Sequence, residues 1–443
     1  MLPCGIGGPH AAACAAWERY RLPVAITEAH LGCTREEQLR WLAEVWAAAQ
    51  TCRAEGADVR AVTVWSLLGA FDWNTLVTCD AGSYEPGAFD VRGPRPRLTA
   101  LGTLTAELAA GQAPSHPTVA GVGWWHRPER FIFGAPDGPT SISWAGPPAR
   151  PLLIIGSSGT LGRTFARLCI RRGLAAICLT QLELDIANAI AVESCMTRLQ
   201  PWAVINALDS LRVDDAERDP ERCMVENSQG AANLADACAR HGARLLTFSS
   251  DLVFDGTKGS PYVEDDPVAP LNCYGQSKAT AEQQVLQRLP EALIVRTGAL
   301  FGPWDDYNFV TRTLQTLARG ERPFAVADEI VTLTYRPDLV HTSLDLLIDG
   351  ECRLWHLANQ EATSWADHGR LVATLAGYDP ALVIPVSAAS LRRPAARPHY
   401  SALGSSRGLL LSPLEQALSA FLADGDSTWR AAFLAPTAAI GRE

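Results

Sequence analysis

The stretch Leu152-Leu-Ile-Ile-Gly-Ser-Ser-Gly-Thr-Leu-Gly162 decides the fold of the larger part of this chain. Four apolar residues, typical of a buried parallel strand, run directly into three glycines in the spacing GxxGxxG. Glycine permits a tight turn and a close approach of backbone to phosphate, and the helix that follows offers free N–H groups. The pattern predicts a phosphate-binding turn, with a purely structural turn at a sheet edge as the alternative. The expected contacts with a dinucleotide are Gly156, Ser158, Gly159, Thr160, Leu161 and Gly162.

Beyond this turn, short apolar runs alternate with segments of helical periodicity. Such alternation predicts a doubly wound parallel sheet of the Rossmann type. The expected strands are Leu152–Ile155, Ala175–Leu179, Ala203–Ile205, Arg244–Phe248 and Ala292–Arg296, and the expected helices cover residues 160–172, 188–199, 228–241 and 274–289.

The second expected strand ends in Thr180-Gln181, which bears on the choice of cofactor. An acidic residue at this point would bind the ribose 2′-hydroxyl of NADH, and an arginine would bind the 2′-phosphate of NADPH. The sequence has neither there, so NADH and NADPH are open alternatives. Asp185 is expected either to reach the adenine or to cap the helix that follows.

Tyr274 and Lys278 form a second informative pattern. Only Lys258 and Lys278 among the 38 basic residues are lysines. The spacing of Tyr274 and Lys278 places both side chains on one helix face, where the ammonium favours the phenolate and lowers the tyrosine pKa. Ser250 follows the strand Arg244–Phe248, at the end where ligands bind in open α/β sheets. The pattern favours Tyr274 as a proton donor and Ser250 as a hydroxyl that binds a substrate carbonyl oxygen. The alternative is that Tyr274 and Lys278 are a pair on the helix surface and that Ser250 only caps its strand.

Six longer motifs follow one another in the order of the chain. They are Val204-Ile-Asn-Ala207, Phe248-Ser-Ser-Asp-Leu-Val-Phe-Asp-Gly256, Pro261-Tyr-Val-Glu-Asp-Asp266, Pro270-Leu-Asn-Cys-Tyr-Gly-Gln-Ser-Lys278, Arg296-Thr-Gly-Ala-Leu-Phe-Gly302 and Tyr335-Arg-Pro-Asp-Leu339. Together they resemble the dTDP-4-dehydrorhamnose reductase family of extended short-chain dehydrogenases, over about residues 151–425.

The resemblance implies reduction of the 4-keto group of a dTDP-linked 6-deoxyhexose by NADH or NADPH, as from dTDP-4-dehydrorhamnose to dTDP-rhamnose. It implies a catalytic triad of Ser250, Tyr274 and Lys278, although the family usually has threonine in place of Ser250. Lys278 would also hold the nicotinamide ribose. Two alternatives stay open, a non-catalytic cofactor-binding regulatory module and a nucleotide-sugar epimerase. The implied substrate contacts are Ser250, Asp251, Val253, Phe254 and Arg336, and the further cofactor contacts are Asn206, Ala207, Tyr274 and Lys278.

Composition narrows the function classes. The net charge is −10 and no run of lysines and arginines occurs, which argues against nucleic acid or an acidic membrane surface as partner. The 12 cysteines show no zinc-type spacing, so we expect reduced thiols and a cytoplasmic protein. We assign no metal ligands, and the use of a metal stays open. We also expect no signal peptide and no transmembrane helix. A homodimer is an open alternative to a monomer.

The first 112 residues predict a separate β/α segment. Strands are expected at Leu22–Ile26 and Val59–Leu67, with a helix from a Thr34/Glu37 capping box to about residue 56 and another at Leu98–Ala109. Residues 113–150 are predicted to be a linker, and 151–430 the reductase domain, with a substrate-binding part mainly within 300–400.

Residues 24–30 (VAITEAH) and 64–73 (VWSLLGAFDW) resemble the last two β/α units of family 1 glycoside hydrolases, with Glu28 matching the nucleophile. The resemblance implies a partial barrel, too short to supply the second carboxylate of a glycosidase.

Overall fold

The computed structural model describes residues 7–80, 82–127, 150–208 and 212–424. Contacts between Cα atoms divide the chain into two compact units. Of the described residues, one unit contains those within 7–127 and 150–151 together with 169–175 and 348–350, and the other contains those within 152–168, 176–347 and 351–424. Part of the predicted linker, residues 128–149, lies outside the described residues.

The first unit is built on two parallel strands, β1 (Val24–Ala29) and β2 (Val59–Val64), joined by the long helix α2 (Arg35–Ala54). The predicted β-α-β order is therefore present, but in this unit the described residues give a two-stranded parallel sheet and short hairpins, not a barrel wall. The remaining elements are α1 (Gly8–Tyr20), β3 (Ala70–Phe71), β4 (Tyr84–Glu85), β5 (Phe89–Asp90), β6 (Arg97–Leu98) and α3 (Ala100–Ala109).

Two details of the first unit differ from expectation. Helix α1 was not predicted, because an alanine-rich segment has no marked apolar stripe. The capping box at Thr34 is also wrong. The Thr34 side chain makes no capping bond and donates its hydroxyl hydrogen bond to Glu36 Oε1 at 2.5 Å.

The second unit contains a six-stranded sheet with all neighbouring strands parallel, as the sequence predicted. Every predicted strand is present within a few residues, and the strand order is β16-β11-β10-β9-β7-β8. The sheet strands are β7 (Leu152–Ile155), β8 (Ala176–Leu179), β9 (Ala203–Asn206), β10 (Arg244–Ser250), β11 (Leu293–Thr297) and β16 (Arg353–His356).

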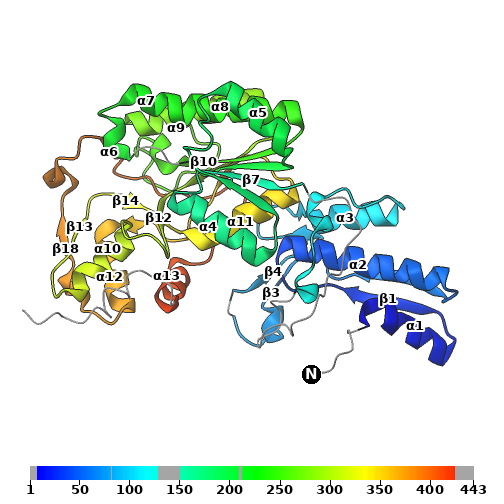
Figure 1. Ribbon diagram of the computed structural model, residues 1–443. Coiled ribbons are helices and arrows are strands. Elements are labelled where there is room, and N and C mark those ends of the chain that lie inside the picture. The colour runs from blue at the N-terminus through cyan, green and yellow to red at the C-terminus, as the bar shows by residue number, and fades with distance from the viewer. Residues whose placement is uncertain (1–6, 81, 128–149, 209–211, 425–443) are drawn as a thin grey trace, which may run out of the picture. The chain divides into compact units, whose positions relative to one another are not determined.

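Helices cover both faces of this sheet (Figure 1). The first group consists of α5 (Ala189–Leu199), α8 (Gly230–His241) and α9 (Cys273–Arg288), and the second of α4 (Thr160–Arg172) and α11 (Arg336–Asp349). Each of the four strands at the centre contains a short apolar run because both faces of the sheet are covered, as in Leu152–Ile155, where each residue is at most 1% exposed. This arrangement is the doubly wound fold.

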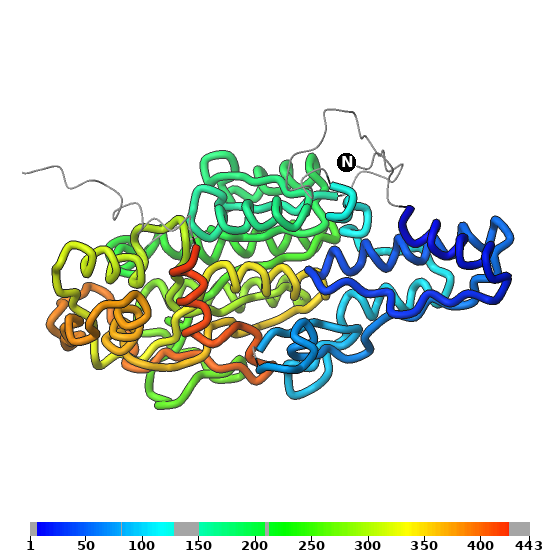
Figure 2. The backbone as a smooth tube through the Cα atoms, turned by 90° about the horizontal axis from the view of Figure 1, so that it is seen from below, coloured from blue at the N-terminus to red at the C-terminus, as the bar shows by residue number. Residues whose placement is uncertain are grey.

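A smaller part is formed by segments that lie between β11 and β16 and by segments that follow β16. Here β13 (Phe324–Val326) pairs with β18 (Ile384–Val386), and α10 (Phe309–Ala318) packs on α12 (Trp365–Leu375). Figure 2 shows these segments side by side although they are far apart in the sequence. The other elements are α6 (Val213–Ala216), α7 (Pro220–Met224), β12 (Ala299–Phe301), β14 (Ile330–Val331), β15 (Leu333–Tyr335), β17 (Thr363–Ser364) and α13 (Leu414–Ala423).

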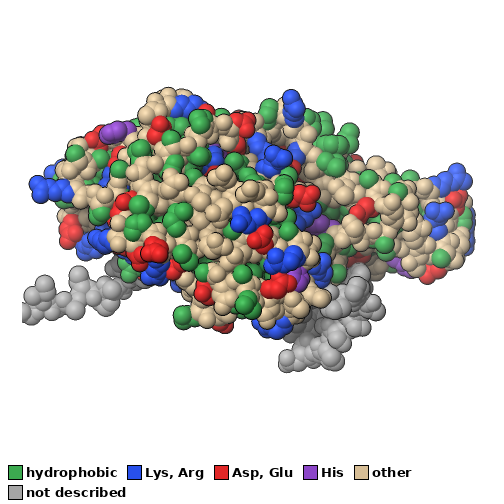
Figure 3. Space-filling view, turned by 90° about the horizontal axis from the view of Figure 1, so that it is seen from above, with side chains coloured by type: hydrophobic (Ala, Val, Ile, Leu, Met, Phe, Trp, Pro, Cys, Tyr) green, Lys and Arg blue, Asp and Glu red, His purple; other side chains and the backbone are tan. Residues whose placement is uncertain are grey.

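Charged side chains of both signs are interspersed on the face drawn in Figure 3. Among the described residues, no helix combines the length and the apolar character needed to cross a lipid bilayer.

Candidate active site

The glycine turn lies where the strand order reverses, between β7 and β9. In open α/β sheets this switch point is where ligands bind. Gly156 has φ +91°, and a Cβ there would lie 2.9 Å from the Ala207 carbonyl oxygen. A Cβ on Gly162 would lie 2.2 Å from the carbonyl oxygen of Gly156. Both positions therefore require glycine for the turn to close against the next strand.

The rest of the turn is open to a ligand. Ser158 and Gly159 are exposed, whereas Leu161 is buried, and α4 begins at Thr160. The exposed backbone precedes the first turn of α4, whose N–H groups are suited to bind a phosphate. The turn thus has the space and the donors that a dinucleotide pyrophosphate needs.

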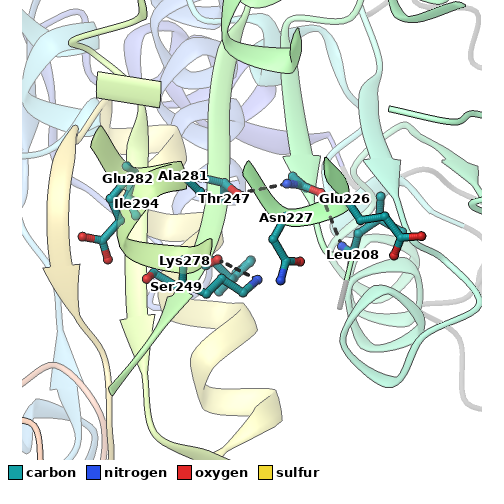
Figure 4. Close-up of a pocket in the computed structure, with 11 residues that line it drawn as sticks. Leu208, Glu226, Asn227, Thr247, Ser249, Lys278, Ala281, Glu282 and Ile294 are labelled. Atoms are coloured by element: carbon teal, nitrogen blue, oxygen red, sulfur yellow. Dashed lines mark hydrogen bonds between the residues drawn. The ribbon is translucent and has the colours of Figure 1, made fainter. Parts of the chain in front are cut away.

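A small pocket opens at the carboxyl ends of β9 and β10 (Figure 4). Asn206 lines it and donates a hydrogen bond to Thr247 Oγ1 at 3.1 Å, and Ala207, next in the chain, is buried. Ser249 Oγ is buried beside the same pocket and has no hydrogen-bond partner among the described residues. Buried hydroxyl groups usually have a hydrogen-bond partner, and a bound cofactor could supply the partner for Ser249.

A π-helical turn at Val225–Gln229 adds residues that the motif analysis did not assign. It brings Glu226 and Asn227 to the same pocket, where Asn227 donates a hydrogen bond to Ser277 Oγ at 3.0 Å. Single π-turns inside helices are frequent at functional sites. The turn itself leaves no pattern of side chains by which it could be recognised in the sequence.

Lys278 joins this pocket to the predicted catalytic residues. Its side chain is buried on α9, and Nζ donates a hydrogen bond to the Phe248 carbonyl at 3.4 Å. Nζ also lies 5.5 Å from the ring centroid of Tyr274, one turn earlier on α9. The predicted pairing of the two side chains on one helix face is confirmed.

Tyr274 and Ser250 line a second cavity, of about 290 Å³. Ser250 comes from the end of β10, where its Oγ accepts a hydrogen bond from the Leu252 N–H at 3.1 Å and donates one to Asp251 Oδ1 at 2.8 Å. To donate to a substrate oxygen, this hydroxyl has to turn away from Asp251. The two cavities therefore place Ser250, Tyr274 and Lys278 around one edge of the sheet.

Asp251 lines the second cavity, as expected of a substrate contact. Its Oδ2 accepts a hydrogen bond from Ser401 Oγ at 2.6 Å. Burial raises the pKa of Asp251 despite the hydrogen bonds from Ser401 and Ser250.

Val253 and Phe254 do not line this cavity, which corrects the sequence-based expectation. Both side chains are 0% exposed, and the Phe254 ring stacks on Tyr262 with centroids 4.0 Å apart. Motif position alone could not distinguish a substrate contact from this core packing.

Arg336 is also placed differently from expectation. Its side chain is 1% exposed and forms an ion pair with Asp305 at 2.6 Å, and it is not among the residues that line the second cavity. Burial lowers the pKa of Arg336, and the Asp305 carboxylate opposes that change. The structure gives this arginine a local partner in place of a substrate diphosphate.

Two other arginines, which the sequence analysis did not single out, line the second cavity. Arg393 forms an ion pair with Glu329, and Arg397 forms one with Asp214. Burial alone would raise the pKa of Asp214, but hydrogen bonds from Arg397 and the Ala395 N–H outweigh it and lower the pKa. Both arginines follow β18 in an irregular segment, so no periodic pattern marks them.

Asp185 is exposed and accepts a hydrogen bond from the Ala187 N–H at 2.9 Å. The N-cap of α5 is Asn188, which accepts from the N–H groups of Ile190 and Ala191. The capping alternative for Asp185 is therefore wrong, and its contact with the adenine stays a prediction.

Comparison with known proteins places this unit in a family. Residues 150–422 match the family model described as the RmlD substrate binding domain. The dTDP-4-dehydrorhamnose reductase of Streptomyces griseus is 37% identical over 261 residues, covering 58% of this chain and 86% of that protein. The dTDP-4-keto-6-deoxy-D-glucose reductase of Streptomyces niveus is 31% identical over 253 residues, covering 57% of this chain and 88% of that protein.

A solved structure agrees with this placement. The dTDP-4-dehydrorhamnose reductase of Bacillus anthracis, in complex with NADP, superposes with a TM-score of 0.58 at 30% identity and covers 62% of this chain and 98% of that chain. The match of residues 150–422 leaves residues 1–149 outside the family model, and the resemblance of residues 1–112 to glycoside hydrolases stays a prediction. Through its second unit, the chain belongs to the dTDP-4-dehydrorhamnose reductase family.

Proposed function

We propose that this chain reduces the 4-keto group of a dTDP-linked 6-deoxyhexose with NADPH, converting dTDP-4-dehydrorhamnose to dTDP-rhamnose. The observation that carries the proposal is the placement of Ser250 and Tyr274 on the wall of one cavity, with Lys278 one helical turn behind. NADP in the Bacillus anthracis relative supports the choice of NADPH. The chain would bind this cofactor through the glycine turn, Asn206 and Lys278.

The protein groups have separate tasks in this reaction. The cofactor, when bound, supplies a hydride to C4 of the sugar. Negative charge then develops on the keto oxygen, where the Ser250 hydroxyl donates a hydrogen bond and Tyr274 delivers the proton. Lys278 stabilises the phenolate that remains, because a positive charge close to it favours the ionised form.

The nucleotide end of the substrate needs cations, because a diphosphate carries negative charge. Arg393 and Arg397 on the cavity wall are suited to this role, since a planar guanidinium forms paired hydrogen bonds with phosphate oxygens. Their present partners, Glu329 and Asp214, hold the two side chains in position until the substrate competes for them.

The proposal is tested by incubating the full chain with dTDP-4-dehydrorhamnose and NADPH and following the absorbance of NADPH. We expect one NADPH oxidised for each dTDP-rhamnose formed. A change in the sugar without net oxidation of NADPH would indicate an epimerase, and cofactor binding without any turnover would indicate a regulatory module. Either result would contradict the proposal. Parallel assays with dTDP-4-keto-6-deoxy-D-glucose compare the two sugars named for its relatives.

A further inference from the structure

A cluster of metal-ligating side chains lies in the first unit, far along the chain from the reductase residues. His10 and Cys14 lie one turn apart on α1, and Cys52 lies near the end of α2. Their ligand atoms all lie within 4.8 Å of one another. Glu55, directly after α2, adds a carboxylate whose Oε2 is 2.8 Å from His10 Nε2 and 3.6 Å from Cys14 Sγ.

The distances between these atoms are close to those of a tetrahedral zinc site. With zinc–ligand bonds of about 2.0–2.3 Å, neighbouring ligand atoms are about 3.3–3.8 Å apart. Cys14 Sγ lies 3.6 Å from His10 Nε2 and 3.6 Å from Glu55 Oε2, within this range. The two sulfurs, 2.9 Å apart, and the His10–Glu55 pair are closer, so these atoms would have to separate by less than about 1 Å to admit the ion.

The Cys14 and Cys52 thiols lie side by side, with their sulfurs 2.9 Å apart, and the Glu55 carboxylate lies close to Cys14. A zinc ion replaces thiol protons because coordination stabilises the thiolate. The cluster thus combines two sulfurs, an imidazole and a carboxylate, all of which are groups that bind zinc.

We propose that His10, Cys14, Cys52 and Glu55 bind one zinc ion, which ties α1 to α2. Two thiolates and an imidazole favour zinc over harder cations such as magnesium or calcium. Binding releases one proton from each thiol and involves no oxidation or reduction. The sequence alone does not indicate this site, because the His10/Cys14 and Cys52/Glu55 pairs are distant along the chain.

A structural role follows from where the cluster lies. Ala13 of α1 is buried in a core with Ala49 and Cys52 of α2, and Cys14 and Trp17 of α1 are partly buried against this core. A metal ion bound by both helices would add a direct link between them to this packing. Side-chain exposures of 41% for His10 and 53% for Glu55 leave the site open to exchange with dissolved zinc.

The test measures zinc in the full chain, purified under reducing conditions and dialysed against metal-free buffer, by mass spectrometry of the metal. We expect about one zinc per chain in the wild type and less than about a tenth of that in Cys14→Ser and Cys52→Ser. Cys79→Ser, an exposed cysteine outside the cluster, is the matched control and should retain the metal. Reductase turnover, measured on each variant, verifies that the chain is folded.

Cobalt provides an independent readout. Co²⁺ added to the metal-free chain should give the intense visible bands of tetrahedral coordination and thiolate-to-cobalt absorption, both absent in Cys14→Ser. A wild-type chain that holds no zinc and gives no cobalt bands overturns the proposal, as does a Cys14→Ser variant that retains zinc. Loss of two titratable thiols without reductant, together with absence of zinc, would assign Cys14 and Cys52 to a disulfide and also overturn it.

Discussion

Lys278 Nζ lies 5.5 Å from the centre of the Tyr274 ring, and both residues belong to the first two turns of α9. The helix begins at Asn272, whose side chain accepts a hydrogen bond from the Gly275 N–H at 2.7 Å and so fixes its first turn. Lys278 is anchored in turn to the Phe248 carbonyl on β10, the strand that carries Ser250. The proton donor, its cation and the carbonyl-binding hydroxyl are therefore connected through rigid elements.

The Tyr274→Phe variant tests the proton donor. The substitution keeps the ring and removes the phenol, so we expect turnover to fall by about 10²–10⁴-fold while NADPH binding remains measurable. Turnover is followed through NADPH absorbance and binding through quenching of protein fluorescence. Tyr307→Phe is the control and should behave as wild type, because Tyr307 is exposed and does not line the second cavity, where Tyr274 and Ser250 lie. Wild-type turnover in Tyr274→Phe would remove Tyr274 from the mechanism.

The Gly159→Ala variant tests the phosphate-binding turn. Among the described residues other than its chain neighbours, a Cβ at Gly159 would have only the Gly156 carbonyl oxygen within 4 Å, at 3.3 Å, so the chain should fold nearly unchanged. The methyl group would nevertheless project from exposed backbone where a pyrophosphate has to approach closely. We expect the Kd for NADPH to rise by more than about tenfold, with an unchanged melting temperature.

Isothermal titration calorimetry with NADPH provides that Kd. Unchanged affinity would exclude this surface of the turn from the cofactor site. Gly242→Ala is the control, because no described atom lies within 4 Å of the new Cβ. Its φ of +59° means that alanine there strains only the local backbone, so the Kd for NADPH should not change.

Much of the second unit could be predicted from sequence because its signals are local. Leu152–Gly162 predicts a strand, a turn and the start of a helix in consecutive residues, and each strand at the centre of the sheet contains a short apolar run. Tyr274 and Lys278 were recognised because one helical turn fixes their proximity. Arg393 and Arg397 were missed because only the fold of an irregular segment brings them to the cavity, and Arg336 was misplaced because its partner Asp305 lies in a loop. The domain boundaries at residues 112 and 150 stay predictions.

The Arg397→Met variant tests the diphosphate contact. Loss of the guanidinium should raise KM for the dTDP-sugar by about tenfold or more and change kcat little, because the contact is made equally in the ground and transition states. The exposed neighbour Arg392→Met removes the same charge outside the cavity and should leave KM unchanged. A KM unaffected in Arg397→Met would exclude Arg397 from substrate binding.

Arg336→Met should behave in a different way from Arg397→Met. The substitution leaves the largely buried Asp305 carboxylate without its ion-pair partner, so we expect it to lower the free energy of unfolding. Breaking one side of a buried ion pair typically destabilises a protein by about 3–5 kcal/mol. We therefore expect a lower urea midpoint for Arg336→Met and, in the folded fraction, a KM close to wild type. A raised KM with wild-type stability would restore the contact with substrate that the sequence suggested.

The pH dependence of stability should report the buried His368 on α12. Burial lowers the pKa of His368 from 6.5 to about 4, and its Nδ1 has no hydrogen-bond partner among the described residues. The unfolded chain binds a proton on His368 below about pH 6.5, whereas the folded chain binds it only near pH 4. The free energy of unfolding is therefore highest above pH 6.5 and falls as the pH is lowered, by at most about 3 kcal/mol.

The His368→Gln variant tests this dependence, because its amide can still donate a hydrogen bond to the Val331 carbonyl. Urea unfolding at pH 7.5 and pH 4.5 should show a smaller loss of stability in this variant than in the wild type. His399→Gln, at an exposed histidine, is the control and should keep the wild-type difference between the two pH values. An equal loss of stability in wild type and His368→Gln would show that His368 does not contribute to the acid sensitivity.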